Sequence, residues 1–256
     1  MKLSCLGTIV AIAWSATALA AGPKPDVSVK TRYIEASVTL DHGIKADAAL
    51  AENCLTEGKR WLEKHRKEAA GEFKSSPELF RDGRAWTFER DYARTSMVAD
   101  RYVSVLRSDF FYTGGAHPNR DIDTILWDST TKKRISIRPF FTETADDGPT
   151  MKAMLAGVIA SLTKEKKARD ADSPAREWAS NLSPKLLGIG AVTLAPSTIE
   201  GKSSGLAFHY PPYAVGAYAE GSYDAFVPWE TLKPYLSSEG AAIFAGTRPK
   251  SDETAK

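Results

Sequence analysis

The segment from Ala46 to Phe73 limits the folds open to this chain more than any other stretch. It is rich in Ala, Glu, Lys and Leu, which favour helix, and it predicts one long helix. Side chains near helical spacing mark the face expected to be buried: Leu50, Cys54, Trp61, Leu62 and His65. The run from Lys59 to Lys67 is strongly basic around that face, and we interpret it as a solvated helix surface.

Strand-like segments lie on both sides of this helix. Apolar residues alternate from Val27 to Leu40, and further short strands are expected at 85–88, 95–98, 102–106, 123–128, 134–140, 191–194, 206–210 and 218–227. Shorter helices are expected at 151–162, 175–182 and 231–236. Because the helices are inserted between strand groups without regular βαβ alternation, the sequence predicts an α+β fold with antiparallel sheets.

The N-terminus predicts a secretory signal peptide over residues 1–20. Lys2 supplies a positive charge, the stretch from Leu3 to Ala20 has no charged residue, and Ala18-Leu19-Ala20 offers small residues to a signal peptidase. The apolar run is short for a membrane span, although an uncleaved anchor is the alternative. We therefore expect cleavage after Ala20, a periplasmic or secreted protein, and no stable membrane anchor after cleavage.

Charge and cysteine content narrow the class of protein further. The chain carries 34 Lys and Arg against 32 Asp and Glu, so it lacks the clustered basic excess that nucleic-acid binding requires. Cys5 lies in the predicted signal, which leaves Cys54 as the single thiol after cleavage and allows no intramolecular disulfide. Since Cys54 lies on the apolar face of the predicted helix, we expect it to be buried and inert.

A glycine-rich turn follows Phe110 and Phe111. Paired glycines permit positive φ, and Pro118 pushes the residue before it toward extended backbone. The pattern predicts a loop at the end of a strand that contacts a ligand. The residues expected to make that contact are Tyr112, Gly114, Gly115, His117 and Asn119. The alternative is a structural turn in which the His and Asn side chains bond to nearby backbone.

His117 is also the centre of an enzymatic alternative. Asp121 and Asp123 are candidate carboxylate partners for it, and Ser104 or Thr113 are candidate nucleophiles. The sequence has no Gly-x-Ser-x-Gly elbow. Its histidines lack metal-type spacing, and its aspartates do not fit a calcium loop. No metal and no cofactor are therefore expected.

A second motif is rich in tyrosine and proline. Tyr210, Tyr213 and Tyr218 are expected to form a rim for a sugar or a protein partner, because tyrosine combines apolar area with a hydroxyl group. In the alternative interpretation, Pro211-Pro212 shapes a corner and the tyrosines pack beneath it.

Three segments, in this order, resemble one family. They are Tyr112-Thr113-Gly114-Gly115-Ala116-His117-Pro118-Asn119, a hairpin from Ile125 to Phe141, and the stretch from Phe208 to Gly221 that closes on Val227-Pro228-Trp229-Glu230. Together they resemble the RsiV/PdaC-like extracytoplasmic domain of unknown function. The resemblance implies a PdaC-type N-terminal α+β domain at 26–107 and an RsiV-like α+β domain at 108–240. Residues 246–256 are expected to form a disordered tail.

In that family the module binds lysozyme in one case and precedes a peptidoglycan deacetylase in another. A sigma-binding region and a deacetylase domain are not seen in this sequence, so we do not expect signalling or deacetylation to carry over. The resemblance implies a non-enzymatic envelope recognition module for lysozyme or a peptidoglycan-derived ligand. The alternatives are a cell-wall hydrolase or deacetylase-like enzyme centred on His117, and an accessory folding partner of an envelope complex.

Overall fold

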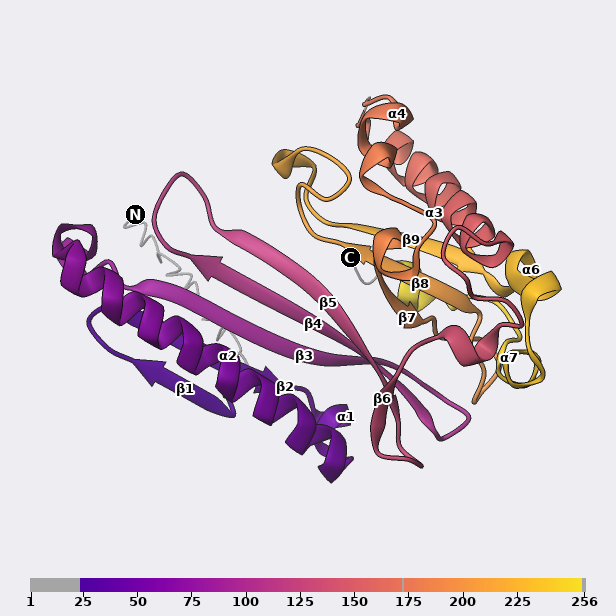
Figure 1. Ribbon diagram of the computed structural model, residues 1–256, viewed down its shortest axis with the longest axis horizontal. Helices are drawn as coiled ribbons and strands as arrows, with labels where there is room; N and C mark the ends of the chain where they lie inside the picture. The colour runs from indigo at the N-terminus through magenta and orange to yellow at the C-terminus, as the bar shows by residue number, and fades with distance from the viewer. Residues whose placement is uncertain (1–23, 172, 255–256) are drawn as a thin grey trace, which may run out of the picture.

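The computed structural model describes residues 24–171 and 173–254, so the predicted signal peptide lies outside the described residues. Two β-sheets and their covering helices confirm the α+β class (Figure 1). The larger sheet has six strands in chain order: β1 Val27–Lys30, β2 Ile34–Leu40, β3 Trp86–Val98, β4 Tyr102–Tyr112, β5 Asn119–Asp128 and β6 Lys133–Ile135. The smaller sheet contains β7 Ala191–Leu194, β8 Gly205–Tyr210 and β9 Tyr223–Pro228.

Strand pairing differs from the expected antiparallel sheets at one point. β2 pairs with β3 in parallel, whereas the other neighbouring strands are antiparallel. A parallel pair needs a long crossover connection. Here α1 His42–Lys45, α2 Ala48–Ser75 and a 3₁₀ segment at Pro77–Gly83 form it.

Helix α2 matches the long helix expected from the sequence and lies over one face of the larger sheet (Figure 1). Its N-cap is Asp47, whose carboxylate accepts hydrogen bonds from the backbone N–H groups of Ala49 and Leu50. The same carboxylate accepts from Trp127 Nε1 and Ser129 Oγ, which ties the start of α2 to β5. These bonds lower the pKa of Asp47 although burial opposes ionisation.

Two hydrophobic cores share the larger sheet. Val103 and Val105 of β4 enter the core beneath α2, whereas Tyr102 and Leu126 enter a second core with the smaller sheet. Because successive strand residues point to opposite faces, one strand contributes to both cores. The expected domain boundary between residues 107 and 108 falls inside β4, so the sheet runs through it.

Helix α3 Pro149–Ala168 packs against β9 in the second core. The remaining helices of the described chain are short: α4 Ala175–Trp178, α5 Leu186–Ile189, α6 Trp229–Leu232, α7 Ser238–Ile243 and α8 Lys250–Thr254, with 3₁₀ turns at Arg138–Phe140, Ala179–Asn181, Tyr218–Glu220 and Lys233–Tyr235. Helix α3 corresponds to the helix expected at 151–162 and extends beyond that range at both ends.

Side-chain hydroxyl groups join the two sheets. Ser96 Oγ donates to the Leu194 carbonyl at 2.6 Å, and Ser104 Oγ accepts from the Leu194 N–H at 3.0 Å. Thr124 Oγ1 accepts from the Val192 N–H at 3.1 Å. Since β7 is an edge strand, these bonds satisfy backbone groups that no neighbouring strand pairs.

Part of the segment expected to form a disordered tail at 246–256 makes contacts with the rest of the protein. The Gly246 carbonyl accepts from Trp229 Nε1 at 3.1 Å, the Thr247 carbonyl accepts from the Thr198 N–H, and Arg248 forms an ion pair with Asp252. These contacts hold the segment against the smaller sheet, where Arg248 also lies over the ring of Phe226.

Across residues 24–171 and 173–254, no helix combines the length and apolarity needed to cross a membrane. His, Cys, Asp and Glu side chains in these ranges do not gather into a group suited to a metal ion.

Candidate functional site

The tip of the β4–β5 hairpin carries the glycine-rich motif. Gly114 and Gly115 have φ of 98° and 108°, which confirms the positive φ expected at these glycines. Tyr112 closes the turn by donating its hydroxyl to the Gly115 carbonyl at 2.9 Å. Tyr112 and the glycines therefore shape the loop, and they bring His117 to the exposed end of the hairpin.

The tyrosine-rich motif forms the connection between β8 and β9. Tyr213 is 57% exposed and has a φ of 73°, which is an uncommon backbone conformation for a bulky side chain. Strained backbone of this kind is enriched at functional sites. Tyr218 is half-buried and opens the 3₁₀ turn that ends at Glu220.

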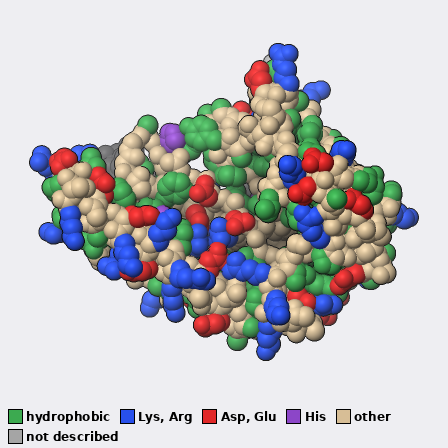
Figure 2. All heavy atoms as spheres, viewed as in Figure 1, with side chains coloured by type: hydrophobic (Ala, Val, Ile, Leu, Met, Phe, Trp, Pro, Cys, Tyr) green, Lys and Arg blue, Asp and Glu red, His purple; other side chains and the backbone are tan. Residues whose placement is uncertain are grey.

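The two motifs meet at one place. The ring of His117 stacks on Tyr218 with a centroid distance of 3.8 Å, and Tyr213 lies 5.4 Å from Tyr218. Tyr218 donates its hydroxyl to the Pro118 carbonyl at 2.9 Å. We call the group His117, Tyr213 and Tyr218 the aromatic surface. Figure 2 shows a histidine packed against hydrophobic side chains where the hairpin approaches the smaller sheet.

Both ring nitrogens of His117 have partners. Nδ1 lies 2.9 Å from the Pro118 carbonyl, which only accepts, so Nδ1 carries the proton. Nε2 lies 3.2 Å from the Tyr213 hydroxyl and accepts from it in the neutral ring. His117 is thus held by a backbone carbonyl and a phenol, and the carboxylate that would orient a catalytic histidine is missing from its two ring-nitrogen partners.

Glu220 anchors the loop that carries the two tyrosines. Its carboxylate lies 2.5 Å from Lys166 Nζ, accepts from the Tyr223 hydroxyl at 2.6 Å, and accepts from the Ala217 N–H at 2.9 Å. Although burial opposes ionisation, these donors lower the pKa of Glu220 to about 2. Lys166 is 3% exposed and the Glu220 side chain is 18% exposed, so the ammonium group is buried and the carboxylate keeps some contact with solvent.

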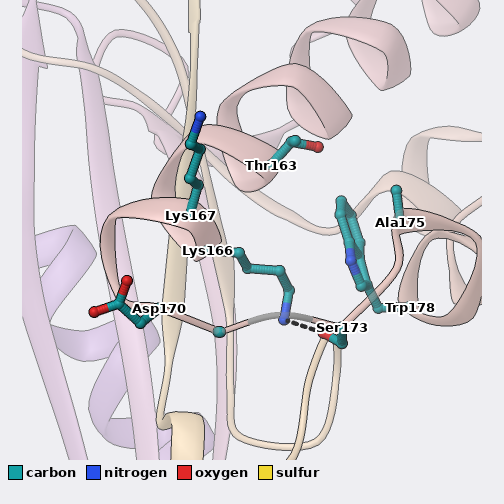
Figure 3. A pocket seen from close by; sticks show the side chains of 8 residues that line it. Thr163, Lys166, Lys167, Asp170, Ser173, Ala175 and Trp178 are labelled. Atoms are coloured by element: carbon teal, nitrogen blue, oxygen red, sulfur yellow. Dashed lines mark hydrogen bonds between the residues drawn. The ribbon is translucent and has the colours of Figure 1, made fainter.

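A cavity of about 480 Å³ lies beside this anchor, between the end of α3 and α4. Figure 3 shows Lys166 reaching across it toward Ser173, 3.4 Å from Nζ, with the ring of Trp178 beside them. The ammonium group also lies 4.5 Å from the Tyr223 ring centroid. Since Lys166 already bonds to Glu220, we interpret this cluster as the support of the aromatic surface.

The carboxylates proposed as partners of His117 lie elsewhere. Asp123 forms an ion pair with Arg107 at 2.9 Å, and Asp121 is exposed on β5 opposite Asp109. His117 is bonded instead to Tyr213 and to backbone, so the predicted catalytic arrangement does not form. Ser104 is fully buried and bonded to Leu194, which removes it as a nucleophile.

Tyr210 requires a correction. It was expected on a ligand-binding rim, but it is 3% exposed and donates its hydroxyl to the Ile189 carbonyl at 2.7 Å. Burial raises the pKa of this phenol. As a strand residue of β8 it points into the second core. Asn119 begins β5 and is exposed, paired with Phe111 in register.

Sequence reasoning missed one hydrogen-bonded chain of residues across the smaller sheet. His209 Nε2 lies 2.9 Å from Thr193 Oγ1, and Nδ1 lies 2.7 Å from Asp224 Oδ1. The order of groups resembles a nucleophile–base–acid relay. However, Thr193 is only 2% exposed, so a substrate does not reach its hydroxyl. We therefore interpret these hydrogen bonds as structural links between the three strands of the smaller sheet. The three residues are far apart in sequence, and strand register alone brings them together.

Cys54 is fully buried in the core beneath α2, as expected. Burial raises the pKa of its thiol to about 12, which leaves very little reactive thiolate at neutral pH.

Part of the chain is similar to a known protein family. Residues 146–230 match the profile of DUF3298, described as a protein of unknown function. No curated protein sequence matches the chain. A crystal structure of a DUF3298 family protein from Pseudomonas aeruginosa PAO1 is similar, with a TM-score of 0.54, 15% identity, and coverage of 83% of this chain and 87% of that one. A family member from Bacteroides fragilis NCTC 9343 gives a TM-score of 0.48, 14% identity, and coverage of 83% and 92%. The chain therefore shares its fold with the Pseudomonas protein, and its residues 146–230 are similar to the DUF3298 family.

Proposed function

We propose that this protein is an exported, non-enzymatic recognition module that binds a peptidoglycan-derived saccharide through the aromatic surface. The observation that carries the proposal is the convergence of two motifs, about a hundred residues apart, on one group of rings of which Tyr213 is exposed. The positive φ of Tyr213 lowers the free energy of unfolding, and strained residues of this kind are concentrated at functional sites.

The chemistry of the aromatic surface favours a sugar. Ring faces carry partial negative charge and attract the C–H groups of a pyranose, while hydroxyl groups at the ring edge bond to its oxygens. Tyr213 offers an exposed ring, and its hydroxyl and the stacked His117 lie beside it. The aromatic surface contains no Lys, Arg, Asp or Glu side chain, which suits a neutral saccharide.

The non-enzymatic part of the proposal is supported by the partners of His117. Its nitrogens bond to Tyr213 and the Pro118 carbonyl, and Asp123 bonds to Arg107. Release of acetate or reducing ends from peptidoglycan by the purified protein, abolished in His117→Ala, would instead establish the hydrolase or deacetylase-like alternative.

The binding prediction concerns Tyr213→Ala. We expect the wild-type protein to bind soluble muropeptides or an N-acetylglucosamine tetramer, and the variant to bind roughly tenfold more weakly because the exposed ring is lost. Isothermal titration calorimetry measures the change. Leu187→Ala is the control, because Leu187 is 97% exposed and lies on α5, outside the aromatic surface. Equal affinities for wild type and Tyr213→Ala would remove the proposed site.

Lysozyme is the second candidate ligand, and it is supported by the resemblance to RsiV/PdaC-like domains. A pull-down at low salt with the same variants separates the two ligands. Binding of lysozyme without saccharide would replace the glycan assignment, and failure of a folded sample with both ligands would overturn the recognition function.

Export is proposed from the N-terminal sequence. We expect the mature protein, recovered from the periplasm or the medium, to begin at Ala21. Intact mass spectrometry measures the N-terminus directly. A cytoplasmic protein that retains Met1 would contradict this part of the proposal.

A further inference from the structure

A long groove lies between α2 and the larger sheet, remote from the residues of the aromatic surface. Its volume is about 870 Å³, and it runs along α2 from Ala49 to Lys64. A helix rises 1.5 Å per residue, so the groove follows the helix for roughly 20 Å. Its shape suits an extended ligand. Figure 2 shows many Lys and Arg side chains over this face of the molecule, with Asp and Glu side chains between them.

The groove is lined by an excess of cations. The positive side chains are Arg60, Lys64, Arg90, Lys132 and Arg134. Only Glu52 and Glu57 contribute carboxylates to the lining. The basic run from Lys59 to Lys67, which by itself indicated a solvated helix surface, therefore supplies two of the cations on one wall.

Part of this charge is neutralised within the protein. Arg90 is 4% exposed and forms a two-pronged bond with Asp109, with Nε 2.6 Å from Oδ1. Arg134 and Arg107 both bond to Glu57. These fixed pairs make the floor of the groove rigid and polar.

The cations at the rim are left for a ligand. Among the described residues, no carboxylate lies within ion-pair distance of Arg60 or Lys132, and Lys64 reaches Glu68 only at 3.8 Å. Arg60 and Lys64 are one helical turn apart and share a face of α2. Trp61 adds a flat apolar surface, held by the guanidinium of Arg90 4.4 Å from its ring centroid.

We propose that this groove binds an extended ligand that carries several phosphate groups in a row. Arginine and lysine donors bind phosphate oxygens strongly, and arginine does so through two parallel N–H bonds. The length of the groove favours a chain of phosphates over one ion. The common chemistry is the phosphate chain, whether its source is a polyphosphate or a phosphodiester polymer of an envelope.

The test compares two double variants on the same helix. Arg60→Glu with Lys64→Glu changes two groove cations, and Lys59→Glu with Lys67→Glu changes two exposed neighbours outside the lining. Both variants alter net charge by the same amount, and each removes one weak ion pair. Circular dichroism confirms that the variants are folded.

Tripolyphosphate is titrated into each protein at about 50 mM salt, where surface charges are weakly screened. We expect at least a tenfold loss of affinity in the groove variant and less than a twofold loss in the control. Equal losses would show non-specific attraction, and no binding to wild type at about 1 mM would overturn the proposal. Glycerol phosphate oligomers and oligothymidylate of equal length then distinguish the source. A neutral dextran that binds equally well would also contradict it.

Discussion

The aromatic surface and the groove along α2 are built in opposite ways. The aromatic surface joins two loops from different sheets, and its rings depend on the Lys166–Glu220 anchor for their position. The groove is formed by one helix packed on a sheet, with a floor of fixed ion pairs. One surface is aromatic and depends on the docking of two parts of the chain. The other is cationic and is formed by one helix and the sheet beneath it. A substitution can therefore impair ligand binding at one surface and leave binding at the other unchanged.

The largest effect is expected from Glu220→Ala. It leaves the Lys166 ammonium buried without a carboxylate, and breaking a buried pair costs about 3 kcal/mol of unfolding free energy. The loop with Tyr213 and Tyr218 loses its anchor, so saccharide binding falls while tripolyphosphate binding is retained. Chemical denaturation measures the loss of stability. Glu177→Ala on α4, an exposed glutamate, is the control and should cost less than about 0.5 kcal/mol.

The same carboxylate predicts how the anchor responds to acid. The pKa of Glu220 is lowered to about 2 in the folded protein, from an ordinary value of 4.5. A lowered pKa contributes stability that is present above pH 4.5 and is lost as the pH falls through about 2. Glu220→Gln should therefore flatten the pH dependence of stability in that range. An unchanged pH profile would show that the pair does not stabilise the loop.

A smaller effect, on the groove, is expected from Gly58→Ala. A Cβ at Gly58 would lie 2.7 Å from Val38 Cγ1, so the methyl group forces α2 away from β2. Overpacking of this kind costs about 1–3 kcal/mol, which exceeds the gain in helix propensity of roughly 1 kcal/mol. We expect weaker tripolyphosphate binding and unchanged saccharide binding.

Gly71→Ala is the matched control on the same helix. Nothing lies within 4 Å of a Cβ at Gly71, so the substitution should stabilise the protein by up to about 1 kcal/mol. Thermal and chemical denaturation of the two variants give the comparison. Equal effects on stability would show that the contact between α2 and β2 is not tight.

Periodicity predicted the elements whose apolar residues follow a simple repeat. The long helix expected at 46–73 appears as α2, and the strand expected at 191–194 is β7. In contrast, β3 was expected only as fragments because Glu89, Arg90 and Asp91 interrupt its apolar pattern. Arg90 can be buried because it forms an ion pair with Asp109 of β4. The residue pattern of β3 alone does not reveal a partner on the neighbouring strand.

The candidate site was also predicted only in part, because local patterns are visible in the sequence and contacts between distant segments are not. The glycines at 114 and 115 indicated a turn from local chemistry, and the turn is present. The contact of His117 with Tyr213 and Tyr218 depends on how two loops dock, which no local pattern contains. Tyr210 looked equivalent to the other tyrosines, but strand alternation in β8 directs it into the core.

The most direct test is a cross-titration of three proteins with two ligands. Wild type, Tyr213→Ala, and the double variant Arg60→Glu with Lys64→Glu are each titrated with the N-acetylglucosamine tetramer and with tripolyphosphate. We predict that Tyr213→Ala loses about tenfold in affinity for the saccharide only, and that the double variant loses at least tenfold for tripolyphosphate only. Loss of both ligands in either variant would contradict the account of two separate surfaces.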